Sequence, residues 1–465
     1  MGFNLLLAVS ISFLGMAPRI SEAAPALSLT EVKVVDGIDA HLSSWGLPFL
    51  QQTVEINSGT LNREGVLAAA AVYEKRLKEL GFETTTVDLK SVNRGCHLFA
   101  EHKGKPGAPR ILLIGHLDTV FEKGAGFLEF KKLADEKLSG PGISDMKGGN
   151  LVILESLEAL RAAGQLDSLN ILVAMTGDEE AIGRDADGSF ATSRGPFIEL
   201  AKRSDYALGF EPMNKSTLAP VVARRSSSSW KMQLTAKPGH SSLVFSKLMG
   251  PGAAFPVAQI LNRFYKELRS EKFVTFNIGT MVAGSTIEHP SGKESSDANV
   301  TGKANIIPAV AQVTGDIRTL SLEALTRTRA KMQRIVETEI AKINRDYDSG
   351  AAVSAEITFK DSYPPMSPTP GNHKLLQQLS RVSEDLGLGK MVGADPMLQG
   401  ASDISFAAQH VIGALDGLGP SGFDYHTHLE QSDIPSLKMA VKRAALMIYR
   451  LHAHAQGPKP GVSKN

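Results

Sequence analysis

The chain has 465 residues, of which 42% are hydrophobic and 21% are charged, and its formal net charge is +1. This composition is typical of a globular protein with about two or three domains, and so neutral a chain gives no support for nucleic-acid binding or for a basic membrane-binding surface. Cys96 is the only cysteine, which excludes disulfides within the chain and metal sites built from several thiolates. A transition-metal site in this chain must therefore use histidines and carboxylates.

The amino terminus has the pattern of an export signal. Residues 5–16 are a short apolar segment, and small residues follow that suit cleavage near Ala23 or after Ala26. We expect residues 1–26 to be a signal peptide, with a buried N-terminal helix as the alternative because no Lys or Arg precedes the apolar segment. No later stretch is apolar and long enough to span a bilayer. The sequence therefore predicts a periplasmic or secreted protein without stable membrane association.

The next region alternates helices and buried strands. Helical spacing over 61–80 ends at Gly81, and strands are predicted within 82–89 and 95–104. The apolar run at 111–114 predicts a buried strand, 148–163 a helix, and 168–180 and 204–212 two further buried strands that end in acidic residues. Strands that alternate with helices in this way predict an α/β fold with a mostly parallel sheet.

The pattern then changes to half-exposed strands. Strands are predicted within 226–242, 272–284, 305–320 and 351–366, with helices at 253–270 and 322–343 and a polar surface loop at 284–303. This order is an inserted α+β module (β-α-β-β-α-β), after which the α/β pattern resumes over 372–451. We expect a catalytic domain formed by 27–223 and 366–465 and a lid formed by 224–365.

Histidines and carboxylates follow the buried strands or lie in glycine-rich loops of the α/β region; they are His116, Asp145, Glu179, Glu180, Glu211 and His426. Each has a structural alternative, such as a helix N-cap for Asp145 or a loop-capping role for His116. Together they are expected on one rim, because ligand sites of α/β sheets lie beyond the carboxyl ends of the strands. Carboxylates that converge repel one another unless a cation lies among them.

Five ligands are too many for one tetrahedral zinc ion with an open position, and they suit two ions if one carboxylate bridges. We expect Asp145 to bridge, with His116 and Glu211 on one ion and Glu180 and His426 on the other. The cofactor is thus predicted to be two divalent metal ions, with Zn²⁺ favoured and Co²⁺ or Mn²⁺ as alternatives.

Two further carboxylates complete the predicted centre. Two metal ions can acidify one water between them, and Glu179, beside the ligand Glu180, is placed to act as general base on that water. Asp118 lies two residues beyond His116 and can accept the other imidazole N–H.

The segments "GHLDTV", "SDMKGG", "DEE", "FEP" and "HTHLE" resemble the signature of the glutamate carboxypeptidase-like co-catalytic zinc peptidases. That family includes carboxypeptidase G, aminoacylases, succinyl-diaminopimelate desuccinylase and di- and tripeptidases, and the resemblance extends from about residue 50 to 450. It implies a zinc-exopeptidase type of catalytic domain, the base role of Glu179, a cis peptide after the bridging Asp145, and a lid domain that commonly dimerises. The family's spacing selects His426 as the ligand, because only it places Glu430 correctly, and leaves His428 as the alternative.

The resemblance extends to the lid and to one loop near it. "AKPGHSS" resembles the segment whose histidine, here His240, polarises the scissile carbonyl, often in the partner subunit's site; an exposed loop histidine is the alternative. "ANIIP" and "GDIR" suggest Asn305 and Arg318 as oxyanion and carboxylate contacts, and "QGASDISF" places Gly400 in a pocket-lining loop. The loop at 284–303 departs from the family's pattern.

These features predict a hydrolase that cleaves an amide or peptide bond and releases a C-terminal amino acid. The expected substrates are small molecules, N-acyl amino acids or short peptides, and a homodimer through the lid is expected. A dipeptidase or aminopeptidase of the same family is the alternative, and a non-catalytic binding protein is a second one that would require a lost ligand or base.

Overall fold

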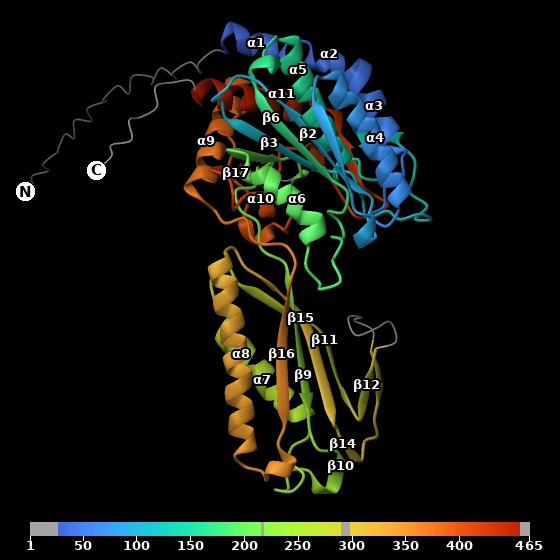
Figure 1. Cartoon of the computed structure of the whole chain (residues 1–465), viewed down its shortest axis with the longest axis vertical. Helices are drawn as coiled ribbons and strands as arrows, with labels where there is room; N and C mark the ends of the chain where they lie inside the picture. Colours follow the sequence, from blue (N-terminus) through green and yellow to red (C-terminus); the bar gives the residue numbers. More distant parts are fainter. Residues whose placement is uncertain (1–26, 215–217, 290–297, 456–465) are drawn as a thin grey trace, which may run out of the picture.

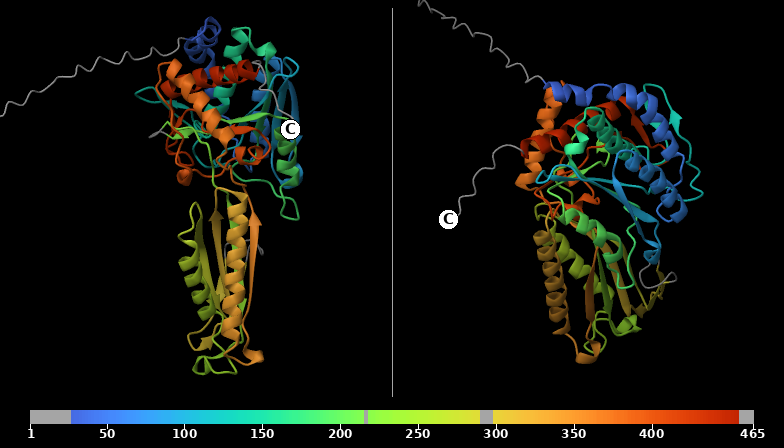
Figure 2. Two further views of the ribbon diagram at one scale, coloured as in Figure 1. Left: turned by 90° about the vertical axis from the view of Figure 1, so that its left-hand side faces the viewer. Right: turned by 45° about the horizontal axis from the view of Figure 1, so that its top comes forward.

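The computed structural model describes residues 27–214, 218–289 and 298–455, so the predicted signal peptide lies outside the described residues. Figures 1 and 2 show a large α/β domain and an elongated lid that projects from it. Among the described residues, no helix combines the length and the apolar character that a membrane span requires.

The α/β domain is built on a six-stranded sheet in the order β1-β2-β6-β3-β7-β17. Its strands are β1 (Glu83–Asp88), β2 (Cys96–His102), β3 (Arg110–His116), β6 (Asn170–Thr176), β7 (Tyr206–Gly209) and β17 (Gly413–Leu415). The pairs β6–β3, β3–β7 and β7–β17 are parallel, whereas β1 and β2 join antiparallel. The prediction of a mostly parallel α/β sheet is confirmed.

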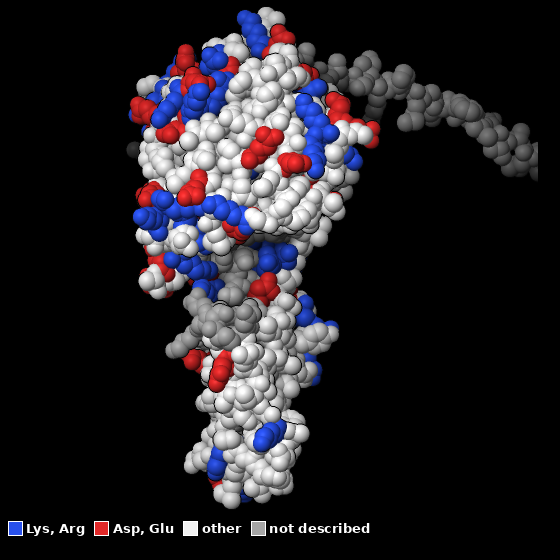
Figure 3. Space-filling model, turned by 90° about the vertical axis from the view of Figure 1, so that its right-hand side faces the viewer, with Lys and Arg blue, Asp and Glu red and all other residues white. Residues whose placement is uncertain are grey.

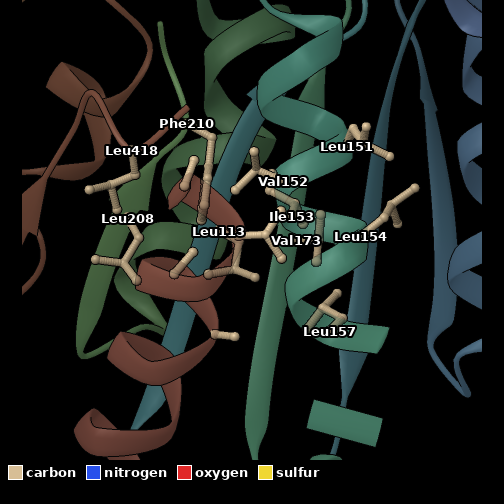
Figure 4. Packing of buried hydrophobic residues seen from close by; sticks show 14 of the residues in the cluster. Leu113, Leu151, Val152, Ile153, Leu154, Leu157, Val173, Leu208, Phe210 and Leu418 are labelled. Atoms are coloured by element: carbon tan, nitrogen blue, oxygen red, sulfur yellow. The ribbon is translucent and has the colours of Figure 1, made fainter. Parts of the chain in front are cut away.

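Helices cover both faces of this sheet. One face carries α1 (Leu29–Val35), α2 (Ile38–His41), α3 (Leu47–Val54), α4 (Arg63–Glu79), α5 (Lys147–Ala162), α9 (Pro370–Asp385) and α11 (Ile434–Ala455), and the other carries α6 (Ala191–Lys202) and α10 (Ile404–Ala407). Alternate residues of β3 enter the two cores, Leu113 on the side of α5 and Leu112 on the side of α6. Burial on both faces explains why this strand is a continuous apolar run. Figure 4 shows Leu113 and Val173 of the sheet packed against α5.

The lid has the predicted β-α-β-β-α-β order. Its elements are β9 (Ser228–Thr235), α7 (Ala254–Leu268), β11 (Thr275–Gly284), β15 (Val310–Arg318), α8 (Leu322–Asn344) and β16 (Ser354–Asp361). The four strands form an antiparallel sheet in the order β11-β15-β9-β16, and Trp230, Met232 and Leu234 of β9 pack with both helices into a separate core.

The prediction of a plain loop at 284–303 is wrong in part. Short strands β12 (Thr286–Glu288) and β13 (Asn299–Thr301) pair antiparallel there, next to β11. Three-residue strands are too short to show the alternation by which a strand is recognised in a sequence.

Candidate metal centre

The centre lies where three neighbouring strands end. His116 is the last residue of β3, Glu179 and Glu180 follow β6, and Glu211 follows β7. Because β6, β3 and β7 are adjacent and parallel, their carboxyl ends meet at one edge of the sheet. Asp145 reaches the same place from the loop before α5.

The structure brings five of the predicted side chains together, and we call this set the carboxylate–histidine cluster: His116, Asp145, Glu180, Glu211 and His426. Asp145 lies between the two histidines, with Oδ1 3.1 Å from Nε2 of His116 and Oδ2 3.1 Å from Nε2 of His426. Glu211 Oε1 lies 3.9 Å from the same nitrogen of His116, and Glu180 Oε2 lies 3.2 Å from that of His426. One carboxylate thus faces two separate histidine–glutamate pairs.

The orientation of His116 is fixed by its neighbours. Its Nδ1 lies 3.0 Å from the backbone carbonyl oxygen of Asp118, whereas the nearer carboxylate oxygen of Asp118 is 3.5 Å away. The prediction that the Asp118 carboxylate accepts this N–H is therefore wrong, because the backbone carbonyl oxygen of Asp118 lies closer and accepts it. That carboxylate accepts instead from the backbone N–H groups of Glu179 at 3.0 Å and Glu180 at 3.1 Å and from the Thr60 hydroxyl at 2.7 Å. Asp118 thus joins the His116 loop to the Glu179–Glu180 loop.

Gly115 permits a close approach behind His116. A Cβ atom at this position would lie 2.0 Å from Oδ1 of Asn150, whose amide nitrogen donates to the His116 carbonyl oxygen at 2.6 Å. Any larger residue would separate β3 from α5 at the point where the histidine leaves the strand.

Glu430 holds the loop that carries Asp145. Its buried carboxylate accepts from the backbone N–H groups of Gly142 (3.0 Å), Ser144 (2.9 Å) and Asp145 (3.0 Å) and from the Ser144 hydroxyl (3.0 Å). The peptide between Asp145 and Met146 is cis, as the family resemblance implies. In the sequence, Glu430 serves only to identify His426 as the ligand. Nothing in the sequence indicates that the Glu430 carboxylate binds the loop that carries Asp145.

The cluster holds a strong excess of negative charge. Burial and the charge of Asp145 raise the pKa of Glu211 well above its usual value, and the same two causes raise that of Glu180. Hydrogen bonds to Asp145 and Glu180 raise the pKa of His426 to about 10. Burial disfavours charge on His116, but the nearby carboxylates of Asp118 and Asp145 outweigh the effect of burial and hold the pKa of His116 well above its usual value. Protons on these groups partly balance charge that a bound cation would balance instead.

The donor set suits divalent metal ions. His116, Asp145 and Glu180 can each place one ligand atom within 4.8 Å of the others, and so can His116, Glu179 and Glu211. Oε1 of Glu180 is buried without a hydrogen-bond partner among the described residues, which leaves a carboxylate oxygen free for a cation. Imidazole and carboxylate donors without thiolate fit Zn²⁺, Co²⁺ or Mn²⁺.

The other histidine of "YHTHLE" lies outside the cluster. His428 stacks on Phe127 with ring centroids 5.6 Å apart and lies 6.0 Å from the ring of Phe121. Between the two candidates, the structure therefore places His426 and not His428 beside Asp145.

Two predicted lid residues lie far from the cluster. His240 belongs to β10 (Gly239–His240), which pairs with β14 (Ile306–Ile307), and the Asn305 carbonyl oxygen accepts from the Ser241 N–H at 2.9 Å. Figure 1 shows β10 and β14 at the end of the lid that points away from the α/β domain. The chain by itself does not bring His240 or Asn305 to the cluster.

Arg318 is the last residue of β15 in the lid, and Gly400 lies in the loop before α10, where it contacts Arg224. Arg318 ends β15 opposite Thr275, is about one-third exposed (35%), and binds Asp316 at 2.9 Å. The Gly400 carbonyl oxygen accepts at 3.0 Å from the buried guanidinium of Arg224, which also binds Asp416 at 2.7 Å. Burial disfavours the charged form of Arg224, but the negative charges of Asp416 and Glu211 have the larger effect, so the pKa of Arg224 is raised. Sequence reasoning missed Arg224, since nothing in "ARRSSSS" separates it from a surface charge.

Comparisons with known proteins agree on one family. The model of "Peptidase family M20/M25/M40" matches residues 112–450. Carboxypeptidase G2 of Pseudomonas sp. (strain RS-16) is 27% identical over 411 residues, which are 87% of this chain and 88% of that protein. The aminopeptidase PepT of Bacillus cereus superposes with a TM-score of 0.67 at 19% identity, covering 87% of this chain and 97% of the other. The YXEP protein of Bacillus subtilis, described as a dinuclear metal binding peptidase, gives 0.60 at 15% identity, covering 89% and 98%.

Proposed function

Since the chain belongs to peptidase family M20/M25/M40 and is a metallohydrolase of that family, we propose that it releases a C-terminal amino acid by cleaving an amide or peptide bond. The position of Asp145 between two histidine–glutamate pairs supports the metal-dependent hydrolysis, and the similarity to carboxypeptidase G2 supports release of the C-terminal amino acid.

Two divalent metal ions are the proposed cofactor. His116 and Glu211 would hold one ion, Glu180 and His426 the other, and Asp145 would contact both; Zn²⁺ is favoured over Co²⁺ and Mn²⁺. The similarity to a dinuclear metal binding peptidase supports a pair of ions. Such ions acidify a water and polarise a carbonyl oxygen.

Glu179 is the proposed proton relay. A carboxylate oxygen of Glu179 lies within 4.8 Å of ligand atoms of His116 and Glu211, so it is placed beside the proposed ions to take a proton from the attacking water and return it to the leaving amine. The backbone N–H of Glu179 donates to the Asp118 carboxylate, so the backbone from which the Glu179 side chain extends is fixed.

The proposed substrates are N-acyl amino acids or short peptides with a free carboxylate. Arg318 ends β15, and the carbonyl oxygen of the next residue, Thr319, accepts at 2.7 Å from the N–H of Ser226 in the connection to the α/β domain. A guanidinium there can bind a carboxylate with two parallel hydrogen bonds. The similarity to carboxypeptidase G2 supports a carboxypeptidase over an aminopeptidase.

A homodimer through the lid is the proposed assembly. β11 is an edge strand of the lid sheet, and Ile278 and Met281 on it are exposed by 40% and 61%. Figure 3 shows few charged side chains on this side of the lid. An apolar edge strand of this kind is suited to pairing with a second copy.

His240 would then serve the partner subunit's site. Nδ1 of His240 lies 3.2 Å from the backbone nitrogen of Ser242 and 2.8 Å from its hydroxyl, so Nε2 is the ring nitrogen that can face a substrate. Nε2–H can donate to a developing oxyanion.

Export to the periplasm or the medium is also proposed, on the apolar leader of residues 5–16 and the small residues after it. Sequencing of the native protein should give an amino terminus near Ala24 to Leu27. A cytosolic protein that begins at Met1 would contradict it.

The reaction is tested by two neighbouring substitutions. Glu179→Gln should keep both metal ions and lose roughly 10²–10⁴ in kcat, the usual effect of removing a general base. Glu180→Gln should weaken metal binding as well, measured as bound metal per chain after dialysis. Near-wild-type turnover of Glu179→Gln on N-acyl amino acids and on dipeptides would contradict the proposed function.

A further inference from the structure

The second crossing between the lid and the α/β domain passes beside the loop that carries Glu179. Tyr363 follows β16 by two residues, and its hydroxyl donates a short hydrogen bond to the backbone carbonyl oxygen of Glu179. The carbonyl oxygen of Tyr363 accepts from the N–H of Ser227, in the first crossing, at 2.9 Å. Tyr363 is thus bonded to the other lid connection and to the Glu179 loop at the same time.

Arg184, on the same loop as Glu179, makes a second contact with the lid. Nη2 of Arg184 donates to the Asp361 carbonyl oxygen at 2.9 Å, and its Nη1 donates to the Gly188 carbonyl oxygen at 2.9 Å. Asp361 is the last residue of β16, and its carboxylate binds Arg329 of α8 at 2.6 Å. The loop after β6 is therefore attached to the end of the lid at two points.

The tyrosine is well placed to act as a permanent donor. Its ring packs on Phe406 with centroids 5.4 Å apart. Burial and the charge of Glu179 raise the pKa of Tyr363 well above its usual value, so the hydroxyl keeps its proton. The peptide groups on both sides of Glu179 are then fixed, the N–H by Asp118 and the carbonyl oxygen by Tyr363.

We propose that Tyr363 is a positioning residue that holds the general base from the lid connection. A backbone fixed on both sides leaves only side-chain torsions to place the Glu179 carboxylate, so loss of the tyrosine hydroxyl should misplace the base without removing any group that binds metal or substrate. This inference rests on the proposed role of Glu179.

Tyr363→Phe removes the hydroxyl and keeps the ring against Phe406. We expect kcat to fall roughly 10–100-fold, since a misplacement of about 1 Å can cost that much, while KM changes less than about twofold and both metal ions remain. Tyr347→Phe, a half-buried tyrosine packed on the lid core, is the matched control and should have wild-type kinetics.

The same substitution in a Glu179→Gln background separates positioning from general damage. If Tyr363 acts through Glu179, then Tyr363→Phe should lower the residual rate of Glu179→Gln no further. An equal fold-loss in both backgrounds would overturn the proposal, and so would wild-type kcat in Tyr363→Phe beside an inactive Glu179→Gln. An active Glu179→Gln enzyme would instead refute the proposed function.

Discussion

Replacement of Glu430 tests whether the loop that it binds places Asp145. The side chain is 0% exposed and accepts four hydrogen bonds of 2.9–3.0 Å. Burial and the charge of Asp145 raise its pKa to about 7, so measurements belong at pH 8, where the carboxyl is ionised. A buried donor without a partner costs roughly 1–3 kcal/mol.

Glu430→Gln keeps one acceptor oxygen and turns an amide toward the Gly142 N–H, which costs roughly 1–3 kcal/mol of unfolding free energy. Removal of the buried charge beside Asp145 offsets part of that cost. Glu430→Ala leaves all four donors without a partner, but water can enter the vacated space, so roughly 3–5 kcal/mol is expected. Both should bind metal about 10–100-fold more weakly, as is usual when a residue that orients a ligand is lost. Denaturant titration of chelator-treated protein and chelator competition measure the two effects.

The matched control is Glu339→Gln, a buried glutamate of lid helix α8 that binds Arg263 at 2.9 Å. It should leave metal affinity unchanged. Wild-type metal affinity in both Glu430→Gln and Glu430→Ala would refute the reasoning.

Three other predictions follow from the site and its surroundings. Arg318→Ala should cost roughly 2–5 kcal/mol in kcat/KM on free-acid substrates and nothing on amidated ones, with poor rescue by Lys; equal losses on both would refute the carboxylate role. Chelation should abolish activity and Zn²⁺ should restore it, whereas turnover by protein shown to be metal-free would contradict the two-metal proposal. Burial lowers the pKa of His97 from 6.5, so the unfolded chain binds that proton more readily and this histidine contributes a loss of stability as the pH falls from 7 to 5. In denaturant titrations the difference in stability between wild type and His97→Asn should therefore shift against the wild type from pH 7 to pH 5, and a difference that does not change with pH would contradict this origin.

The sequence predicted the parts of the fold whose patterns are long and local. The apolar run of β3 and the spacing of α4 and α8 are recognisable because burial on one or two faces repeats with the period of the element. The helices α2 and α3 and the π-helix between them (Leu42–Gly46) were not predicted, because Gly37 and Gly46 interrupt the helical pattern. α6 was missed because Gly195 and Pro196, which lie inside it, normally mark its end.

His116, Glu179, Glu180 and Glu211 could be proposed because they follow strands, and the ends of neighbouring parallel strands must converge. Asp145 and His426 lie in loops and were recognised by their motifs. Glu430, Arg224 and Tyr363 have no such marker. Each acts on a segment more than a hundred residues away, by a hydrogen bond that only the folded chain forms. Their roles depend on three-dimensional distances, which no local spacing encodes.

The position of His240 gives the clearest test of the proposed dimer. The histidine lies at the far end of the lid, whereas Glu179 lies at the sheet edge of the α/β domain. If His240 serves the partner subunit's site, then Glu179→Gln and His240→Ala homodimers each have two defective sites. A heterodimer of the two variants has one site with both residues intact and one site with neither.

Random mixing of the two variants makes half of the dimers heterodimers, so co-refolded protein should recover about a quarter of the wild-type activity. Native mass spectrometry measures the heterodimer fraction, and activity should rise in proportion to it. If His240 acted within its own chain, both sites of the heterodimer would stay defective. An inactive mixture with a measured heterodimer population would therefore refute the shared site, because Glu179 and an intact His240 would then face each other without effect.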